Sequence, residues 1–193
     1  MESKYNMSRL KQKYQEEIKK TLQDEFKIAN VMAIPALKKI NINVGIGDLL
    51  KNKEGKEALS KDMSLIVGQK LSERKAKISV ATFSVREGMV VGLSATLRGE
   101  RMYDFFDKFV NIVLPRLRDF RGVKRTSFDK AGNYTIGLTD HTVFPEIDIT
   151  KAAQAHGMEI TFVTEAGSIE KGTRLMELMG MPFVKVWLLV IEY

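Results

Sequence analysis

The sequence has no cysteine, only two histidines and four prolines among its 193 residues. Without cysteine, a disulfide, a cysteine-ligated zinc, an iron–sulfur cluster and a thiol nucleophile are all excluded, and the composition fits the reducing cytosol. The N-terminal sequence MESKYNMSRLKQ lacks the apolar segment of a secretory signal, and no run of about 20 apolar residues occurs. We therefore expect a cytoplasmic protein with no membrane segment.

Side chains that could perform catalysis or hold a cofactor are not grouped in the sequence. His141 and His156 lie 15 positions apart with no carboxylate at metal-ligand spacing. A glycine pair at 45–47 follows a predicted strand, but Leu50 stands where a dinucleotide-binding motif needs its third glycine. No phosphate-binding GxxxxGK[ST] motif is present. These observations predict no enzyme activity, no bound metal and no cofactor.

Positive charge is in excess, and it is concentrated in the middle of the chain. The 31 lysines and arginines exceed the 24 acidic residues, which gives a formal net charge of +7 and a pI of about 9.5. Residues 70–130 carry 14 basic and 7 acidic side chains, whereas 1–69 and 131–193 carry net charges of +4 and −4. A basic chain of this kind favours an acidic partner such as nucleic acid.

Hydrophobic spacing predicts interleaved helices and strands. Apolar residues recur every four positions from Leu10 to Phe26, which indicates an amphipathic helix, and alternate from Ile40 to Val44, which indicates a half-buried strand. Further helices are predicted at about 49–68, from Gly99 to a bend or end at Pro115, and at 168–179. Strands are predicted at 79–86 and 89–98. Short strands or turns are predicted at 134–138, 142–147 and 158–164. We expect one domain of α+β class, an antiparallel or mixed sheet with helices packed on one face and the other face open.

Basic and amide side chains are distributed in a way that favours nucleic acid over a merely solvated surface. The segment 71–77 (LSERKAK) has no apolar period and is predicted to be an exposed loop, and a second basic cluster spans 116–125. The predicted strand faces and the end of the second helix add polar groups: Asn41, Asn43, Gln69, Lys70, Thr96 and Arg98. Lysine and arginine contact phosphates, while amides and hydroxyls bond sugar and base edges, so the pattern favours RNA or DNA binding.

Six sequence motifs extend this interpretation. They are INVGIG at 42–47, GQK at 68–70, TLRGERM at 96–102, PRLRDFRG at 115–122, GNY at 132–134 and FPEID at 144–148. In this order the motifs closely resemble the bacterial-type fifth protein of the large ribosomal subunit, and the resemblance runs from about Tyr14 to Phe183. It implies an antiparallel sheet with helices on its convex side, in a protein that binds 5S ribosomal RNA in the central protuberance.

The resemblance also implies specific site residues and partners. Asn43, Gln69 and Thr96 match the family's RNA-binding positions, and Asn41, Lys70 and Arg98 stand beside them. The exposed loop 71–82, with Arg74, Lys75 and Lys77, matches a loop that reaches the tRNA in the peptidyl site. Other expected partners are large-subunit rRNA, neighbouring proteins of the central protuberance and the thirteenth protein of the small subunit, which the family contacts in an intersubunit bridge. We expect that bridge to involve the region 108–150, without assigning it to single residues.

Four alternatives remain open from the sequence. The chain could be a basic RNA-modifying enzyme or another RNA-binding translation factor, and Asn43 could cap the turn at Gly45. The apolar extension 184–193 continues past the point where family members commonly end. We expect it to form an added edge strand or a patch packed on the core, the alternative being a contact with RNA or a neighbouring protein.

Overall fold

The computed structural model describes residues 8–49, 52–148 and 155–184, so the predicted role of the extension 184–193 falls almost entirely outside the described residues. The chain divides into two compact units. Unit 1 comprises 1–40, 98–135 and 162–193, and unit 2 comprises 41–97 and 136–161. Because each unit combines segments that are distant in sequence, the division does not cut the chain into successive domains. The single domain stays a prediction.

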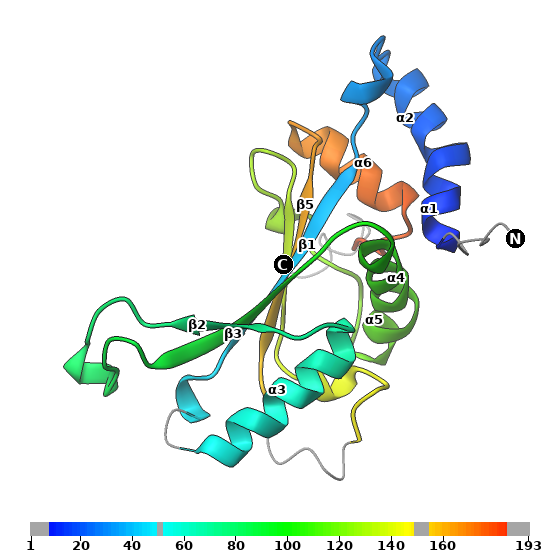
Figure 1. The fold of residues 1–193 in the computed structure, drawn as a ribbon. Coiled ribbons are helices and arrows are strands. Elements are labelled where there is room, and N and C mark those ends of the chain that lie inside the picture. The colour runs from blue at the N-terminus through cyan, green and yellow to red at the C-terminus, as the bar shows by residue number, and fades with distance from the viewer. Residues whose placement is uncertain (1–7, 50–51, 149–154, 185–193) are drawn as a thin grey trace, which may run out of the picture. The chain divides into compact units, whose positions relative to one another are not determined.

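A five-stranded sheet is the main β-structure, and with the helices it confirms the predicted α+β class (Figure 1). Its strands are β1 (Leu37–Gly45), β2 (Ser72–Lys75), β3 (Val90–Leu97), β4 (Tyr134–Leu138) and β5 (Met158–Thr164). Their order across the sheet is β2-β3-β1-β5-β4, and β2 pairs with β3 in antiparallel register. The alternating apolar side chains of β1 give it one face to bury, and the strand lies third of five across the sheet.

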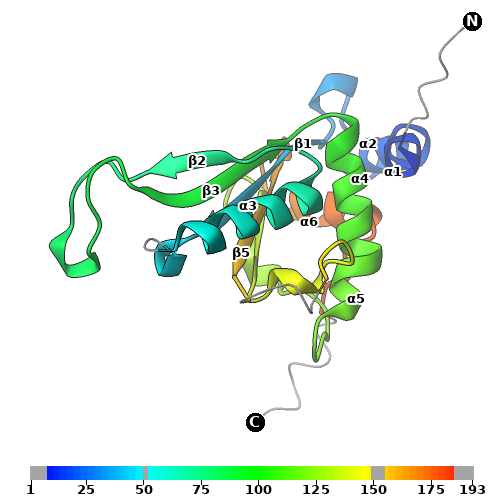
Figure 2. The same ribbon diagram turned by 60° about the horizontal axis from the view of Figure 1, so that its bottom comes forward.

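Within unit 2, the two faces of the sheet differ in chemistry. Helix α3 (Lys53–Val67) packs against β3, and its apolar residues Leu59, Met63 and Ile66 are buried (Figure 2). The sheet side chains on the apolar face are Ile42, Val44, Leu93, Ala95, Leu97 and Ile160, all buried. The intervening positions of the same strands carry amides, hydroxyls and a carboxylate instead. Burial of the apolar set therefore turns the polar set outward.

Two local predictions in unit 2 were wrong. Residues 72–75 form strand β2 rather than part of a loop, with Ser72 opposite Ser94 and Lys75 opposite Val90. All four residues are exposed, as predicted, but an edge strand held by backbone hydrogen bonds needs no apolar alternation. The segment 79–86 is not a strand: Ala81–Phe83 form a 3-10 turn inside an isolated bridge between Val80 and Val85. Residues 76–89, called the hairpin loop below, join β2 to β3.

Unit 1 contains the remaining long helices, which the apolar spacing predicts well. Helix α1 (Arg9–Lys13), a π-helical segment (Tyr14–Ile18) and helix α2 (Lys19–Phe26) follow without a break. Helix α4 (Glu100–Lys108), a second π-helical segment (Phe109–Val113) and α5 (Leu114–Arg116) form another run, which ends one residue after Pro115. Helix α6 (Ile169–Leu178) completes the set. Short 3-10 segments occur at Val31–Ala33, Gly47–Leu49, Arg125–Ser127 and His141–Val143.

The core of unit 1 is aromatic. The rings of Phe106 and Phe109 lie 5.3 Å and 5.6 Å from that of Phe162, and all three side chains are fully buried. Tyr14 is also buried, and its hydroxyl donates a hydrogen bond of 2.9 Å to the carbonyl of Pro35. Burial raises the pKa of Tyr14 to about 12. A buried hydroxyl with a fixed acceptor is a satisfied polar group, so this tyrosine stabilises the unit.

The GNY motif at 132–134 has a structural role in unit 1. Asn133 accepts a 2.9 Å hydrogen bond from the backbone N–H of Thr164, and the Tyr134 hydroxyl donates one of 2.9 Å to the carbonyl of Lys124. Gly132 has a φ of +87° and lies against Gly172 of α6, where a Cβ on Gly172 would stand 2.5 Å from the Gly132 carbonyl oxygen. Only glycine at both positions allows this backbone contact.

We expect Gly172→Ala to destabilise the protein by about 1–3 kcal/mol, because the added methyl group meets backbone that cannot rotate away. Denaturant unfolding measures the change. Gly137→Ala is the matched control: nothing lies within 4 Å of a Cβ there, so its stability should stay within about 0.5 kcal/mol of the parent. Equal stability of the two variants would contradict the close packing of Gly132 and Gly172.

Candidate nucleic-acid interface

Three of the predicted RNA-binding side chains form one hydrogen-bonded group on the polar face of unit 2. The amide nitrogen of Gln69 donates to the backbone carbonyl of Thr96 at 3.2 Å, and the Thr96 hydroxyl donates to Oδ1 of Asn41 at 3.0 Å. Gln69 follows Gly68, whose left-handed conformation ends α3 and turns the chain toward β3. We call Asn41, Gln69 and Thr96 the polar cluster.

The hydrogen bonds inside the polar cluster determine which groups remain for a ligand. Because Oδ1 of Asn41 accepts from Thr96, its amide nitrogen is left as a donor, and the Thr96 oxygen keeps lone pairs as an acceptor. The carbonyl oxygen of Gln69 has no partner among the described residues. All three side chains are half-buried. The cluster therefore presents fixed donors and acceptors suited to ribose hydroxyls and base edges.

Asn43 lies two positions further along the same face of β1 and is exposed. Its amide nitrogen donates to Oε2 of Glu159, on β5, at 3.5 Å. The side chain is thus directed across the sheet to a neighbouring strand, and the alternative role of capping the turn at Gly45 finds no support here. Glu159 was missed in the sequence, although its position between buried Met158 and Ile160 places it on the polar face.

The cations predicted for the site are exposed. Lys70 follows Gln69 directly and belongs to unit 2 with the polar cluster and Asn43. Arg98 comes immediately after β3 and belongs to unit 1, so the structure groups five of the six predicted residues in one unit. Neither cation forms an ion pair with another described residue. Both charges are available to a phosphate.

The basic residues predicted for the tRNA-contacting loop lie partly on strand β2 and partly in the hairpin loop. Arg74 lies on β2, and its guanidinium donates to the Ser94 hydroxyl on β3 at 3.5 Å, so it belongs to the sheet. Lys75 ends β2, and Lys77 lies in the hairpin loop. Both lysines are exposed and have no acidic partner among the described residues. The hairpin loop also exposes Phe83, at 72% of its surface.

Unit 1 carries a second basic surface after α5. Four side chains of the 116–125 cluster are exposed and unpaired within the described part of the chain: Arg116, Arg118, Arg121 and Lys124. Arg125 differs, because it donates to Glu177 at 2.6 Å and lies over the ring of Phe183. The charges of the four unpaired side chains are therefore the ones in this cluster that are available to a polyanion.

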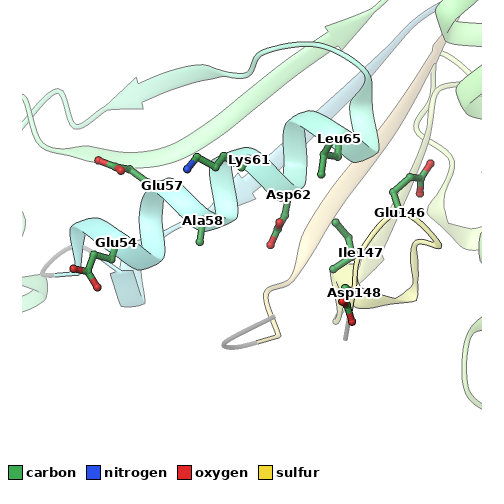
Figure 3. A pocket seen from close by; sticks show the side chains of 9 residues that line it. All are labelled: Glu54, Glu57, Ala58, Lys61, Asp62, Leu65, Glu146, Ile147 and Asp148. Carbon is green, nitrogen blue, oxygen red and sulfur yellow. The ribbon is translucent and has the colours of Figure 1, made fainter. Parts of the chain in front are cut away.

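An acidic hollow of about 590 Å³ lies in unit 2 between α3 and residues 146–148 (Figure 3). Its lining carries five carboxylates and one lysine: Glu54, Glu57, Asp62, Glu146, Asp148 and Lys61. Leu65 is also part of the lining and is exposed at 61% of its surface. Carboxylates of this density repel phosphate, so the hollow is unsuited to RNA.

Among residues 8–49, 52–148 and 155–184, no group of three or more histidine and acidic side chains is placed to hold a metal ion. Within the same ranges, no helix combines the length and the apolar character that crossing a membrane requires.

A polar sheet face with an exposed lysine beside it suits RNA binding. Two family models match the chain: that of ribosomal protein L5 over residues 30–86, and that of the ribosomal L5 family C-terminus over residues 90–183. Curated relatives are named large ribosomal subunit protein uL5. The protein from Carboxydothermus hydrogenoformans is 50% identical over 177 residues, covering 92% of this chain and 99% of its own. That from Desulforamulus reducens is 47% identical over 180 residues, covering 93% and 99%.

The chain therefore belongs to the ribosomal protein L5 family, as the six motifs predicted. It is a protein of the large ribosomal subunit that takes part in translation, and its place is the ribosome of the cytoplasm. Members of this family are structural ribosomal proteins, so the interpretation as an RNA-modifying enzyme is set aside.

Proposed function

We propose that the chain binds 5S rRNA through the polar face of unit 2. The observation that carries this proposal is the polar cluster: side chains from β1, β3 and the end of α3 are joined by hydrogen bonds on one face of the sheet. A preset group of donors and acceptors loses little side-chain entropy on binding, which suits recognition of a folded RNA. Asn43 extends the same surface toward β5.

Charged and neutral side chains have different roles in this proposal. Lys70 and Arg98 supply phosphate attraction, which depends little on sequence, whereas the neutral groups set the register of the RNA. The exposed arginines and lysine of the 116–125 cluster offer a further surface for phosphates of the large-subunit rRNA. Together they are six of the 14 basic side chains in the central third of the chain.

We propose that the end of β2 and the hairpin loop contact tRNA in the peptidyl site. Lys75 and Lys77 are exposed and unpaired within the described residues, while Arg74 is bonded to Ser94 and takes a position nearer the sheet. Exposed lysines have flexible side chains, and their ammonium groups contact phosphate as point charges without fixed geometry. Such contacts suit a phosphate backbone that must be bound and released.

Protein partners are proposed for the opposite side of unit 2. The predicted bridge region 108–150 includes Glu146 and Asp148, which line the acidic hollow. A carboxylate-lined surface suits a basic protein segment, such as one from the thirteenth small-subunit protein or from a neighbour in the central protuberance. The charge of the hollow keeps this protein contact distinct from the RNA surface.

We expect Asn43→Ala, Gln69→Ala and Thr96→Ala each to weaken binding to 5S rRNA while the protein stays folded. Loss of one hydrogen bond per variant should reduce affinity roughly 2- to 12-fold. Filter binding with purified 5S rRNA measures the change, and circular dichroism checks the fold. Thr82→Ala, an exposed threonine of the hairpin loop, is the matched control and should bind like the parent. Unchanged affinity in all three test variants would exclude this face as the binding site.

The double variant Lys75→Ala, Lys77→Ala should leave 5S rRNA affinity within about twofold and weaken tRNA binding at the peptidyl site of reconstituted ribosomes, since it removes two phosphate contacts. The control Lys13→Ala, Lys20→Ala loses the same charge from exposed positions of the first helical run. It should not change tRNA binding. A large loss of 5S rRNA affinity in the hairpin variant would show that the hairpin has no separate role.

A further inference from the structure

Glu159 is a carboxylate on the face proposed to bind RNA. It is exposed on β5, which lies next to β1 in the sheet, and its carboxylate accepts from the Asn43 amide at 3.5 Å. A carboxylate repels phosphate, so its place on such a face calls for a different kind of RNA group. The RNA groups that a carboxylate can accept from are ribose hydroxyls and the N–H groups of bases.

The pair formed by Asn43 and Glu159 presents a defined order of donors and acceptors. Asn43 contributes a donor, because one amide hydrogen bonds Glu159 and the second remains. Glu159 contributes two adjacent acceptor oxygens that can accept a forked pair of hydrogen bonds. The order across the pair is therefore donor, acceptor, acceptor, which is also the order on the Watson–Crick edge of cytosine.

Guanine is the base that complements this order. Its Watson–Crick edge presents the acceptor O6 followed by the donors N1–H and N2–H. Uracil has one N–H between two acceptors, and adenine has an amino donor beside the acceptor N1, so neither offers two adjacent donors. Cytosine offers one amino donor and two acceptors. Of the four bases, only guanine matches the pair at all three positions.

We propose that Asn43 and Glu159 together bind the Watson–Crick edge of an unpaired guanine in the RNA. The inference rests on the proposed binding of 5S rRNA through this face and adds a base-reading position to it. The guanine is unpaired because this edge is occupied by cytosine in a duplex, and sequence-specific proteins read such edges in loops and bulges. Glu159 is then a specificity-determining residue.

The alternative role for Glu159 is structural, holding Asn43 in place within the protein. The Asn43–Glu159 contact is 3.5 Å long and both residues are exposed, so it adds little to stability. Glu159→Gln keeps the shape of the side chain and replaces one acceptor oxygen by a donor. It should therefore leave the unfolding transition unchanged while removing the match to guanine.

The test combines Glu159→Gln with inosine, which lacks the N2 amino group of guanine. 5S rRNA carrying inosine at random guanine positions is incubated with the full-length protein, and bound and unbound RNA are compared position by position. With the parent protein, inosine at one unpaired guanine should reduce binding roughly tenfold or more, the effect of losing a hydrogen bond to a charged group. With Glu159→Gln, inosine at that position should reduce binding less than about twofold.

The control variant is Glu57→Gln, which makes the same charge change in the acidic hollow. It should retain the full effect of inosine seen with the parent. If the parent binds 5S rRNA but no unpaired guanine is sensitive to inosine, or if Glu159→Gln keeps the same sensitivity, the guanine site is wrong and the proposed function stands. If the parent does not bind 5S rRNA at all, both are overturned.

Discussion

Burial of one face of the sheet against α3 is the constraint on which the proposed interface depends. Since side chains alternate along each strand, placing Ile42, Val44 and Leu97 in the core leaves Asn41, Asn43 and Thr96 on the outer face. The end of α3 then supplies Gln69 at the edge of that face, because Gly68 terminates the helix there. A shift of β1 by one residue would bury Asn41 and Asn43, and the same shift of β3 would bury Thr96, so the fold and the interface are specified together.

The hydrogen bond from Thr96 to Asn41 determines which atom of the Asn41 amide faces outward. The hydrogen bond occupies the amide oxygen and leaves the amide nitrogen outward. The Asn41 amide therefore has one favoured orientation and presents a donor to a ligand. Lysine and arginine side chains, in contrast, remain exposed and without ion-pair partners within the described residues at Lys70, Arg98 and the 116–124 positions. Five carboxylates of unit 2 line the hollow beside α3, whereas Glu159 lies on the polar face, and this position leads to the proposed base contact.

A pattern within one segment predicts which face a residue occupies, but not which residue of another segment stands next to it. The segment Met158–Thr164 was predicted as a short strand or turn, and it forms strand β5 with those bounds because it buries a regular apolar set. Strand β2 was missed because all its side chains are exposed and backbone pairing with β3 stabilises it, whereas the β-prone segment 79–86 has only an isolated bridge. Strand alternation likewise predicted the outward positions of Asn43 and Thr96. Glu159 lies 116 positions from Asn43, and only the strand order brings the two together.

The central claim is that neutral side chains position the RNA while lysine and arginine supply the attraction. The most direct test is the affinity for 5S rRNA measured over a range of salt concentrations for Thr96→Val and Lys70→Ala. The account predicts that Thr96→Val lowers affinity equally at every salt concentration, with an unchanged slope of log affinity against log salt. Lys70→Ala should reduce that slope by roughly 0.7–0.9, the value for one phosphate contact. A reduced slope for Thr96→Val, or an affinity equal to that of the parent throughout, would contradict it.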